Sequence, residues 1–200
     1  MFLFLSRLTR RWSLCRFSTV VTVTNFQSQI SALQKENEHL RQEIDNLEMY
    51  SRRSCVRVAG VPESQQDTDA AIVEIAGKLN ITLSRDDIDV SHRVGPKSED
   101  RPRQIIARIK NYELRHRLLK SSKHLRKVNG MERVSINQDL TKTRSKLAYE
   151  ARQLVKSRKA KSTFVWDGKI FVIDHNDHKH KILSVADMNE LFAHIGYSKT

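Results

Sequence analysis

A heptad pattern between residues 26 and 47 limits what the N-terminal part of this chain can fold into. Seven residues in this stretch are spaced alternately by four and three positions, and six of the seven are apolar. In heptad notation, Ile30, Asn37 and Ile44 occupy position a, and position d holds Phe26, Leu33, Leu40 and Leu47. A 3.5-residue period places the stripe on one side of a helix and predicts a coiled coil over residues 25–50.

The polar residue in this stripe indicates how the helices pair. A buried Asn37 amide bonds best with the same amide of another copy, which favours parallel helices in register. The predicted self-association residues are therefore Ile30, Leu33, Asn37, Leu40, Ile44 and Leu47. Isoleucine at a with leucine at d is compatible with a dimer. The alternative is an amphipathic helix packed on its own domain, because so short a coiled coil is marginal alone.

The 24 residues before the heptads differ in composition from the rest of the chain. They contain four arginines, several hydroxyl residues and no acidic residue, as mitochondrial transit peptides do. An unstructured leader is the alternative. The β-branched run from Val20 to Val23 disfavours a helix, and Asn25 is a suitable cap. We therefore expect residues 1–24 to be a disordered or transit-like leader and the helix to begin at residue 25.

Positive charge is concentrated in one block of the chain. The net charge is +13, and residues 101–161 contain nineteen Lys or Arg against four Asp or Glu. Such a block attracts polyanions and displaces counterions from nucleic acid; a solvated basic surface is the alternative explanation. The spacing of Cys15 and Cys55 excludes a zinc finger and argues against a disulfide framework, which fits a reducing compartment. No apolar run is long enough for a membrane span.

Residues 54–138 alternate between strand and helix patterns. The strand patterns cover residues 55–62, 87–94, 103–110 and 132–140, and the helix patterns cover 67–81 and 112–126. This β-α-β-β-α-β order is that of ferredoxin-like folds and RNA-recognition motifs. The first and third strands lack the aromatic residues on which such motifs stack bases. Alternation instead places Arg57 and Arg108 on one face of neighbouring strands, which suits contact with phosphate or with water.

A second basic unit is expected over residues 139–195, built as helix, hairpin and helix. Its first helix has an apolar side and a basic side, and the basic side holds Lys142, Lys146, Arg152 and Lys156. Arg144 falls on the apolar side, so it should point into a cleft or at the neighbouring domain. Lys159 and Lys161 extend the charge into the following loop.

The hairpin of this unit is predicted from a two-residue turn, Asp167-Gly168, between strand patterns. Trp166 precedes the turn and can either stack on a base or pack across the strands. Ser184 begins a capping pattern that starts the last helix.

No motif in the chain supports catalysis or a cofactor. A nucleophile elbow, a phosphate loop and paired catalytic acids are all missing from the sequence, so we expect a protein that is not an enzyme. The tract DHNDHKH, residues 174–180, places His175 and His178 near each other. We expect an exposed loop there without a second group of ligands, and therefore predict no metal site.

Five segments in a fixed order carry a resemblance to a known family. They read LEMYSRRSCVRVAGVPE, DIDVSHRVG, RPRQIIARIK, INQDLTKTRSKLAYEARQLVKS and FVWDGKIFV, within residues 47–172. This series resembles the protein encoded by the first open reading frame of LINE-type retrotransposons. Residues 139–192 also resemble the C-terminal domain of the baculovirus few-polyhedra protein.

The resemblance implies a parallel, trimeric coiled coil and an RNA-recognition-motif-like domain. It also implies a C-terminal domain that closes over single-stranded nucleic acid, coating of element RNA, and strand annealing. The family's contact positions fall here on Arg52, Arg53, Arg93, Lys142, Arg144 and Arg152. The family's coiled coil is usually much longer, which suggests a degenerate or domesticated copy, or a gene model that begins inside an element.

Together these features predict an α+β protein with three parts: a coiled-coil helix, a ferredoxin-like or RRM-like domain, and a small helix-hairpin-helix domain. The predicted function is non-sequence-specific binding, coating and annealing of single-stranded RNA or DNA by a parallel homo-oligomer, without membrane partners. We expect a cytoplasmic ribonucleoprotein, with nuclear and mitochondrial locations as alternatives. The alternative function is a structural protein whose coiled coil binds a partner helix and whose basic block binds an acidic protein or virion surface.

Overall fold

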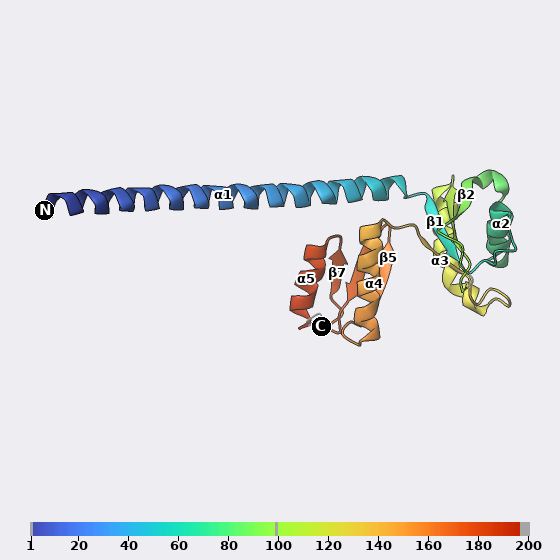
Figure 1. Ribbon diagram of the computed structural model, residues 1–200. Coiled ribbons are helices and arrows are strands. Elements are labelled where there is room, and N and C mark those ends of the chain that lie inside the picture. The colour runs from blue at the N-terminus through green and yellow to red at the C-terminus, as the bar shows by residue number, and fades with distance from the viewer. Residues whose placement is uncertain (1, 99, 197–200) are drawn as a thin grey trace. The chain divides into compact units, whose positions relative to one another are not determined.

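The computed structural model describes residues 2–98 and 100–196, and their side chains from residue 23 onward. Helices and antiparallel sheets are mixed along the chain (Figure 1). The chain divides into two units between Asn46 and Leu47. Within the described residues, no helix combines the length and the apolar character needed to cross a membrane.

The first unit lies in one long helix, α1, which spans Phe2–Ser51. The helix continues without a break through Val23, Thr24 and Asn25, so the predicted start at residue 25 with Asn25 as cap is wrong. Extending a helix is much easier than starting one, and a β-branched residue costs only about 0.7 kcal/mol or less relative to Ala. The prediction of a transit-like leader depends on the side chains of residues 1–22, and these lie outside the part of the chain whose side chains are described.

The second unit begins with a four-stranded antiparallel sheet and its helices. Chain order gives β1 Cys55–Ala59, α2 Thr68–Lys78, η1 Arg85–Asp87, β2 Ile88–Val94, β3 Gln104–Ile109, α3 Tyr112–Ser121, η2 Ser122–Lys127 and β4 Ser135–Gln138. The strands lie side by side in the order β2-β3-β1-β4. These elements lie within a few residues of their predicted positions. The last strand is the shortest, because only four of the predicted residues pair with β1.

Side-chain alternation gives this sheet one buried and one open face. The buried face packs against α2 and α3 and includes Val56, Val58, Ile105, Ala107, Ile109 and Ile136. Residues between them in sequence, such as Arg57, Gln104 and Asn137, point to the other face, because successive side chains of a strand alternate. Both helices are therefore on one side, and polar side chains cover the other.

Side-chain caps fix where the two helices of this domain begin. Asp67 accepts a hydrogen bond from the backbone N–H of Ala70 at the start of α2. Asn111 accepts from the backbone N–H groups of Glu113 and Leu114 at the start of α3. Each cap satisfies donors that the first turn of a helix leaves without an intrahelical partner.

A second, three-stranded sheet follows, packed against two helices. The strands are β5 Ser162–Trp166, β6 Lys169–Ile173 and β7 Lys179–Ile182, and they lie side by side in that order. The two helices are α4 Lys142–Lys156 and α5 Val185–His194. Asp167 and Gly168, between β5 and β6, both have positive φ, as a two-residue hairpin turn requires. Ser184 and Asp187 form the predicted capping box at the start of α5.

His175 and His178 lie in an exposed loop, as expected, but the strand β7 that follows them was not predicted. Lys179 and His180 belong to β7, which pairs with β6 at the edge of the sheet. The sequence KHKI is charged and carries little of the alternation that identifies a strand, and charged residues are common at sheet edges. The domain therefore has a third strand in addition to the predicted hairpin.

A buried carboxylate joins three parts of the second unit. The Asp139 side chain is only 3% exposed, and it lies just before α4. Its Oδ2 accepts a hydrogen bond from Nη1 of Arg52 at 2.7 Å, next to the end of α1. Its Oδ1 accepts from Nε and Nη2 of Arg57 in β1, at 3.0 and 2.6 Å. Two arginines from separate elements therefore converge on one acid.

We predict that Asp139→Ala lowers the free energy of unfolding by about 3 kcal/mol, because it leaves two partly buried guanidinium groups without their acceptor. Urea denaturation at neutral pH measures this loss. The matched control is Asp89→Ala, which removes a half-exposed carboxylate 3.7 Å from Arg108 and should cost less than about 1 kcal/mol. Equal losses in the two variants would contradict a structural role for Asp139.

Candidate nucleic-acid interface

A cleft lies at the open face of the four-stranded sheet. Its volume is about 480 Å³, and three arginines from different elements line it, namely Arg57 of β1, Arg126 of η2 and Arg152 of α4. The remaining lining is mostly amides and hydroxyls, from Gln104, Ser135, Asn137, Gln138 and Ser145. Cations and neutral hydrogen-bonding groups therefore line the same cleft. No sequence pattern marks Arg126 or Asn137 as parts of one site, because their elements meet only in the fold.

Arg57 enters this cleft with its charge already paired. Two of its nitrogens donate to Asp139, and Nη1 donates to Oε1 of Gln104 at 3.1 Å. A phosphate at Arg57 would have to compete with the buried side chain of Asp139. Of the three arginines that line the cleft, Arg126 and Arg152 are the exposed ones.

Arg108 lies on the same sheet face as Arg57 but not directly beside it. The antiparallel register places Arg57 opposite Ile106 and Arg108 opposite Cys55. The predicted side-by-side pair of charges is therefore offset along the strands. Arg108 is half exposed and lies 3.7 Å from Asp89.

The basic side of α4 is exposed as its helical spacing predicts. The exposed cations of this helix are Lys142, Lys146, Arg152 and Lys156. We call these four residues the α4 row. The opposite side of the helix is buried in the domain core through Leu147, Ala151 and Leu154. The core thus fixes which way the four charges face.

Arg144 is on the buried side of α4, as predicted, and is only 4% exposed. Its Nη1 donates to the carbonyl oxygen of Gly168 at 3.0 Å, in the turn between β5 and β6. A Cβ on Gly168 would lie 3.2 Å from this nitrogen and still closer to Met49. Arg144 therefore supports the turn, and its burial separates it from the α4 row.

The two lysines after α4 differ in their surroundings. Lys159 is exposed, and Lys161 forms an ion pair with Asp177. Lys159 therefore extends the positive surface beyond the helix. Lys161 is exposed as well, but its charge is balanced by its neighbour.

Trp166 belongs to an aromatic group that the sequence pattern does not reveal. Its indole is half exposed and meets the ring of His116 edge to face at a centroid distance of 4.9 Å. His116 in turn stacks with Tyr112, one helical turn earlier in α3, at 6.4 Å. The i, i+4 spacing of Tyr112 and His116 is visible in the sequence. Their position beside Trp166 is not, because α3 and β5 are far apart in the chain.

Arg93 is held by backbone carbonyls instead of facing solvent. Its side chain is 7% exposed. Nη1 donates to Val61 and Arg103 oxygens at 3.1 and 2.9 Å, and Nη2 donates to the oxygens of Pro62 and Gln65. This network ties the loop after β1 to β2. Arg93, which the sequence resemblance predicts to contact nucleic acid, therefore has a structural role in this chain.

The two arginines after the heptads also have local partners. Arg52 binds Glu48, one helical turn before it, in addition to Asp139. Arg53 is exposed, and its guanidinium lies 3.7 Å from the centre of the Tyr50 ring. Arg53 is therefore the one of the pair that still presents its charge to solvent.

The predicted self-association residues form an exposed stripe on α1. Their apolar members are 49% to 70% exposed in the single chain, namely Ile30, Leu33, Leu40, Ile44 and Leu47. Asn37 and the heptad residue Phe26 are exposed too. The stripe is thus apolar, continuous along the helix and open to solvent.

Comparison with known proteins adds no family assignment. No family model matches this chain, and no curated protein matches it.

Beside Arg93, the carboxylate of Glu63 forms an ion pair with Arg103. Arg103 donates to it through Nη2 at 3.0 Å and through its backbone N–H at 2.6 Å. Hydrogen bonds from the side chain and the backbone N–H of Arg103, together with the positive charges of Arg103 and Arg93, lower the pKa of Glu63 from 4.5 to about 2. Because the folded pKa lies below the unfolded one, ionised Glu63 stabilises the fold above about pH 4.5, and this contribution is lost as the pH falls towards 2.

We predict that Arg103→Ala returns the pKa of Glu63 towards 4.5, because the variant removes both the side-chain hydrogen bond and the positive charge. An NMR titration of the Glu63 carboxyl carbon measures the change. Arg101→Ala is the control, since Arg101 is exposed and makes no contribution to the lowered pKa of Glu63. An unchanged pKa in the Arg103 variant would contradict this explanation.

Proposed function

We propose that this chain binds single-stranded RNA or DNA without sequence preference, coats it, and promotes annealing of complementary strands. The observation that carries the proposal is the α4 row, Lys142, Lys146, Arg152 and Lys156, because all four cations are exposed on one side of a helix fixed by its core. Its Arg152 also lines the cleft at the open sheet face. A polyanion that follows the row would release counterions, which drives binding regardless of sequence.

The sheet supports backbone binding more than base reading. Strand order β2-β3-β1-β4 with both helices on one face is compatible with the RNA-recognition-motif-like fold proposed from the sequence. Such motifs stack bases on strand aromatics, whereas the open face here carries Arg57, Gln104 and Asn137. Amides and cations hydrogen-bond phosphate and sugar oxygens, which are the same in every nucleotide.

The aromatic group at Trp166 supplies a stacking surface outside the four-stranded sheet. Base stacking tolerates any sequence, because every base has a π-face. Trp166, His116 and Tyr112 are contributed by β5 and α3. A single strand held by cations can therefore also stack a base without a sequence-specific hydrogen bond.

The family resemblance gives this proposal its biological setting. We propose a non-enzymatic, LINE-type retrotransposon protein that forms ribonucleoprotein particles, with a C-terminal domain of the few-polyhedra type. The proposed location is a cytoplasmic ribonucleoprotein.

The structural-protein alternative is supported by two ion pairs of the basic surface. Lys161 pairs with Asp177 and Arg108 pairs with Asp89, so cations of this surface already accommodate carboxylates. Recovery of the protein from cells with and without nuclease separates the two functions, since nuclease-resistant complexes favour a protein partner.

Self-association through α1 is the second part of the proposal. An exposed apolar stripe of this length marks an interaction surface, and its 3.5-residue period fits another helix of the same kind. Parallel copies would bring the Asn37 amides together. Oligomerisation would then multiply weak contacts of several α4 rows along one strand.

We predict that replacing all four residues of the α4 row with Gln weakens binding to single-stranded RNA and DNA about tenfold or more. The slope of log K against log salt should become shallower by roughly 0.7 for each phosphate that the variant no longer binds. Filter binding over a salt series measures both quantities. The control variant removes four exposed cations elsewhere, at Lys78, Lys97, Arg101 and Lys181. Equal effects in both variants would place the binding site outside the α4 row.

We also predict that Leu40→Asp with Ile44→Asp converts the protein to a monomer, because two charges would face the apolar seam. Asn37→Ile should keep the oligomer, raise its stability and broaden the range of oligomeric states, since the variant lacks the register-setting amide. Light scattering of the full chain reports the molar mass of each variant. A monomeric parent protein at micromolar concentration would contradict self-association.

A further inference from the structure

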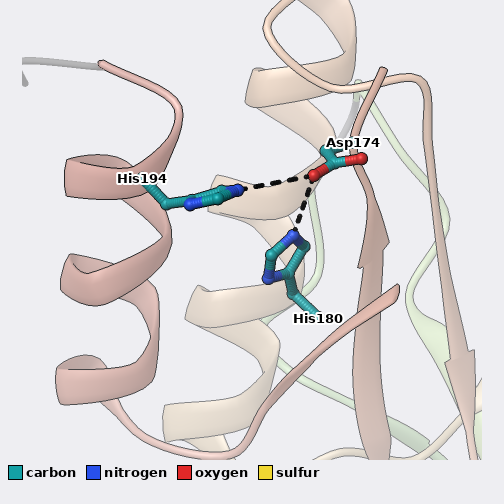
Figure 2. Close-up of side chains that lie close together, drawn as sticks. All are labelled: Asp174, His180 and His194. Atoms are coloured by element: carbon teal, nitrogen blue, oxygen red, sulfur yellow. Dashed lines mark hydrogen bonds and ion pairs between the residues drawn. The ribbon is translucent and has the colours of Figure 1, made fainter. Parts of the chain in front are cut away.

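Three side chains from three elements meet at one end of the three-stranded sheet (Figure 2). Asp174 directly follows β6, His180 lies in β7, and His194 is the last residue of α5. The sequence tract brings only His175 and His178 to attention as ligands, without a partner group. It does not reveal this arrangement, because His194 is distant in the chain and the pattern marks neither Asp174 nor His180 as a ligand.

The Asp174 carboxylate is buried and held in a fixed orientation. It is 4% exposed. Its Oδ1 accepts hydrogen bonds from the backbone N–H groups of Asn176 and His178 at 2.8 and 2.9 Å. With Oδ1 bound in this way, Oδ2 is directed at the two rings. Figure 2 shows both imidazoles pointing at this oxygen.

Oδ2 of Asp174 lies 3.1 Å from Nε2 of His180 and 3.6 Å from Nε2 of His194. The potential ligand atoms of the three residues all lie within 4.8 Å of one another. Ligands around a tetrahedral zinc ion, at bond lengths of ~2.0–2.1 Å, lie about 3.3 Å apart. The two distances from Oδ2 are close to this value. The carboxylate oxygen is therefore spaced from each imidazole nitrogen as two ligands of one ion would be.

A carboxylate oxygen and two imidazole nitrogens, each able to offer a lone pair, are metal ligands.

We propose that Asp174, His180 and His194 bind one divalent transition-metal ion, and that Zn²⁺ fits the site best. Two imidazole nitrogens with one carboxylate oxygen are ligands typical of zinc, whereas Ca²⁺ takes six to eight oxygens and Mg²⁺ prefers octahedral oxygen ligands. The His194 side chain is 54% exposed, so solvent reaches the site and can supply a fourth ligand. His178 approaches the same oxygen through Nδ1 at 3.4 Å but lies outside the convergent group.

The ion would strengthen the connection between two parts of the domain that the Asp174–His194 contact at 3.6 Å already brings together. Asp174 and His180 belong to the β6–β7 hairpin, whereas His194 ends a helix that is anchored in the core through Met188 and Leu191. An ion bound only by the folded state stabilises it by mass action. Zinc should therefore raise the melting temperature of the C-terminal domain. This inference is independent of nucleic-acid binding.

The test is titration of ZnCl₂ into the full chain, free of any polyhistidine tag and first stripped with chelator, by calorimetry. We expect one saturable site per chain and a higher melting temperature with zinc. His194→Ala should weaken binding at least tenfold, and because this side chain is exposed the variant keeps its fold. Asp174→Asn should also abolish the site, and circular dichroism checks whether the variant is folded.

The matched control is His175→Ala. His175 lies in the same loop and is exposed, but its ring faces the carbonyl oxygen of Arg158. This variant should bind zinc as the parent chain does. The proposal is overturned if the parent shows no saturable site, or if His194→Ala binds zinc as tightly as His175→Ala.

Discussion

The arrangement of the second unit depends on one buried ion-pair centre, the Asp139 carboxylate with Arg52 and Arg57. It connects the end of α1, the central strand β1 and the segment that leads into α4. Removal of the acid would leave two partly buried cations without their acceptor, so the contact favours the arrangement that brings these three segments together. The cleft at the open sheet face is bordered by two of these elements, β1 and α4, so its shape depends on the same centre.

The arginines differ in whether their charge is already bound within the chain. A guanidinium bound to a buried acid, as in Arg57, or to backbone carbonyls, as in Arg93, contributes to the fold and has little free charge for a ligand. The cations of the α4 row are exposed, because the core of the second sheet holds the apolar side of that helix inward. The proposed backbone binding without sequence preference rests on this surface, since exposed Lys and Arg can contact phosphate wherever it lies along a strand.

A second buried acid, Asp174, organises the other end of the C-terminal domain with different chemistry. Asp139 is surrounded by guanidinium groups, which are always protonated and cannot coordinate a metal. Asp174 faces the imidazoles of His180 and His194, which are metal ligands when neutral. Both carboxylates are fixed by several hydrogen bonds. The identity of the basic partner therefore distinguishes a structural ion pair from a candidate metal site.

The sequence by itself determined the features that repeat over short distances. These are the heptad stripe, the strands with one buried face, the basic side of α4, and the turn at Asp167-Gly168. Each follows either from the spacing of apolar and polar side chains or from the backbone conformation of a turn, and neighbouring residues specify both. Tertiary structure alone decided the partners of Arg57 and Arg93, the aromatic group at Trp166, and the convergence of Asp174 with His194. The physical reason is that a charged side chain pairs with whichever oppositely charged group the fold brings near it. Composition alone does not determine whether that group is a carboxylate of the same chain or the phosphate of a ligand.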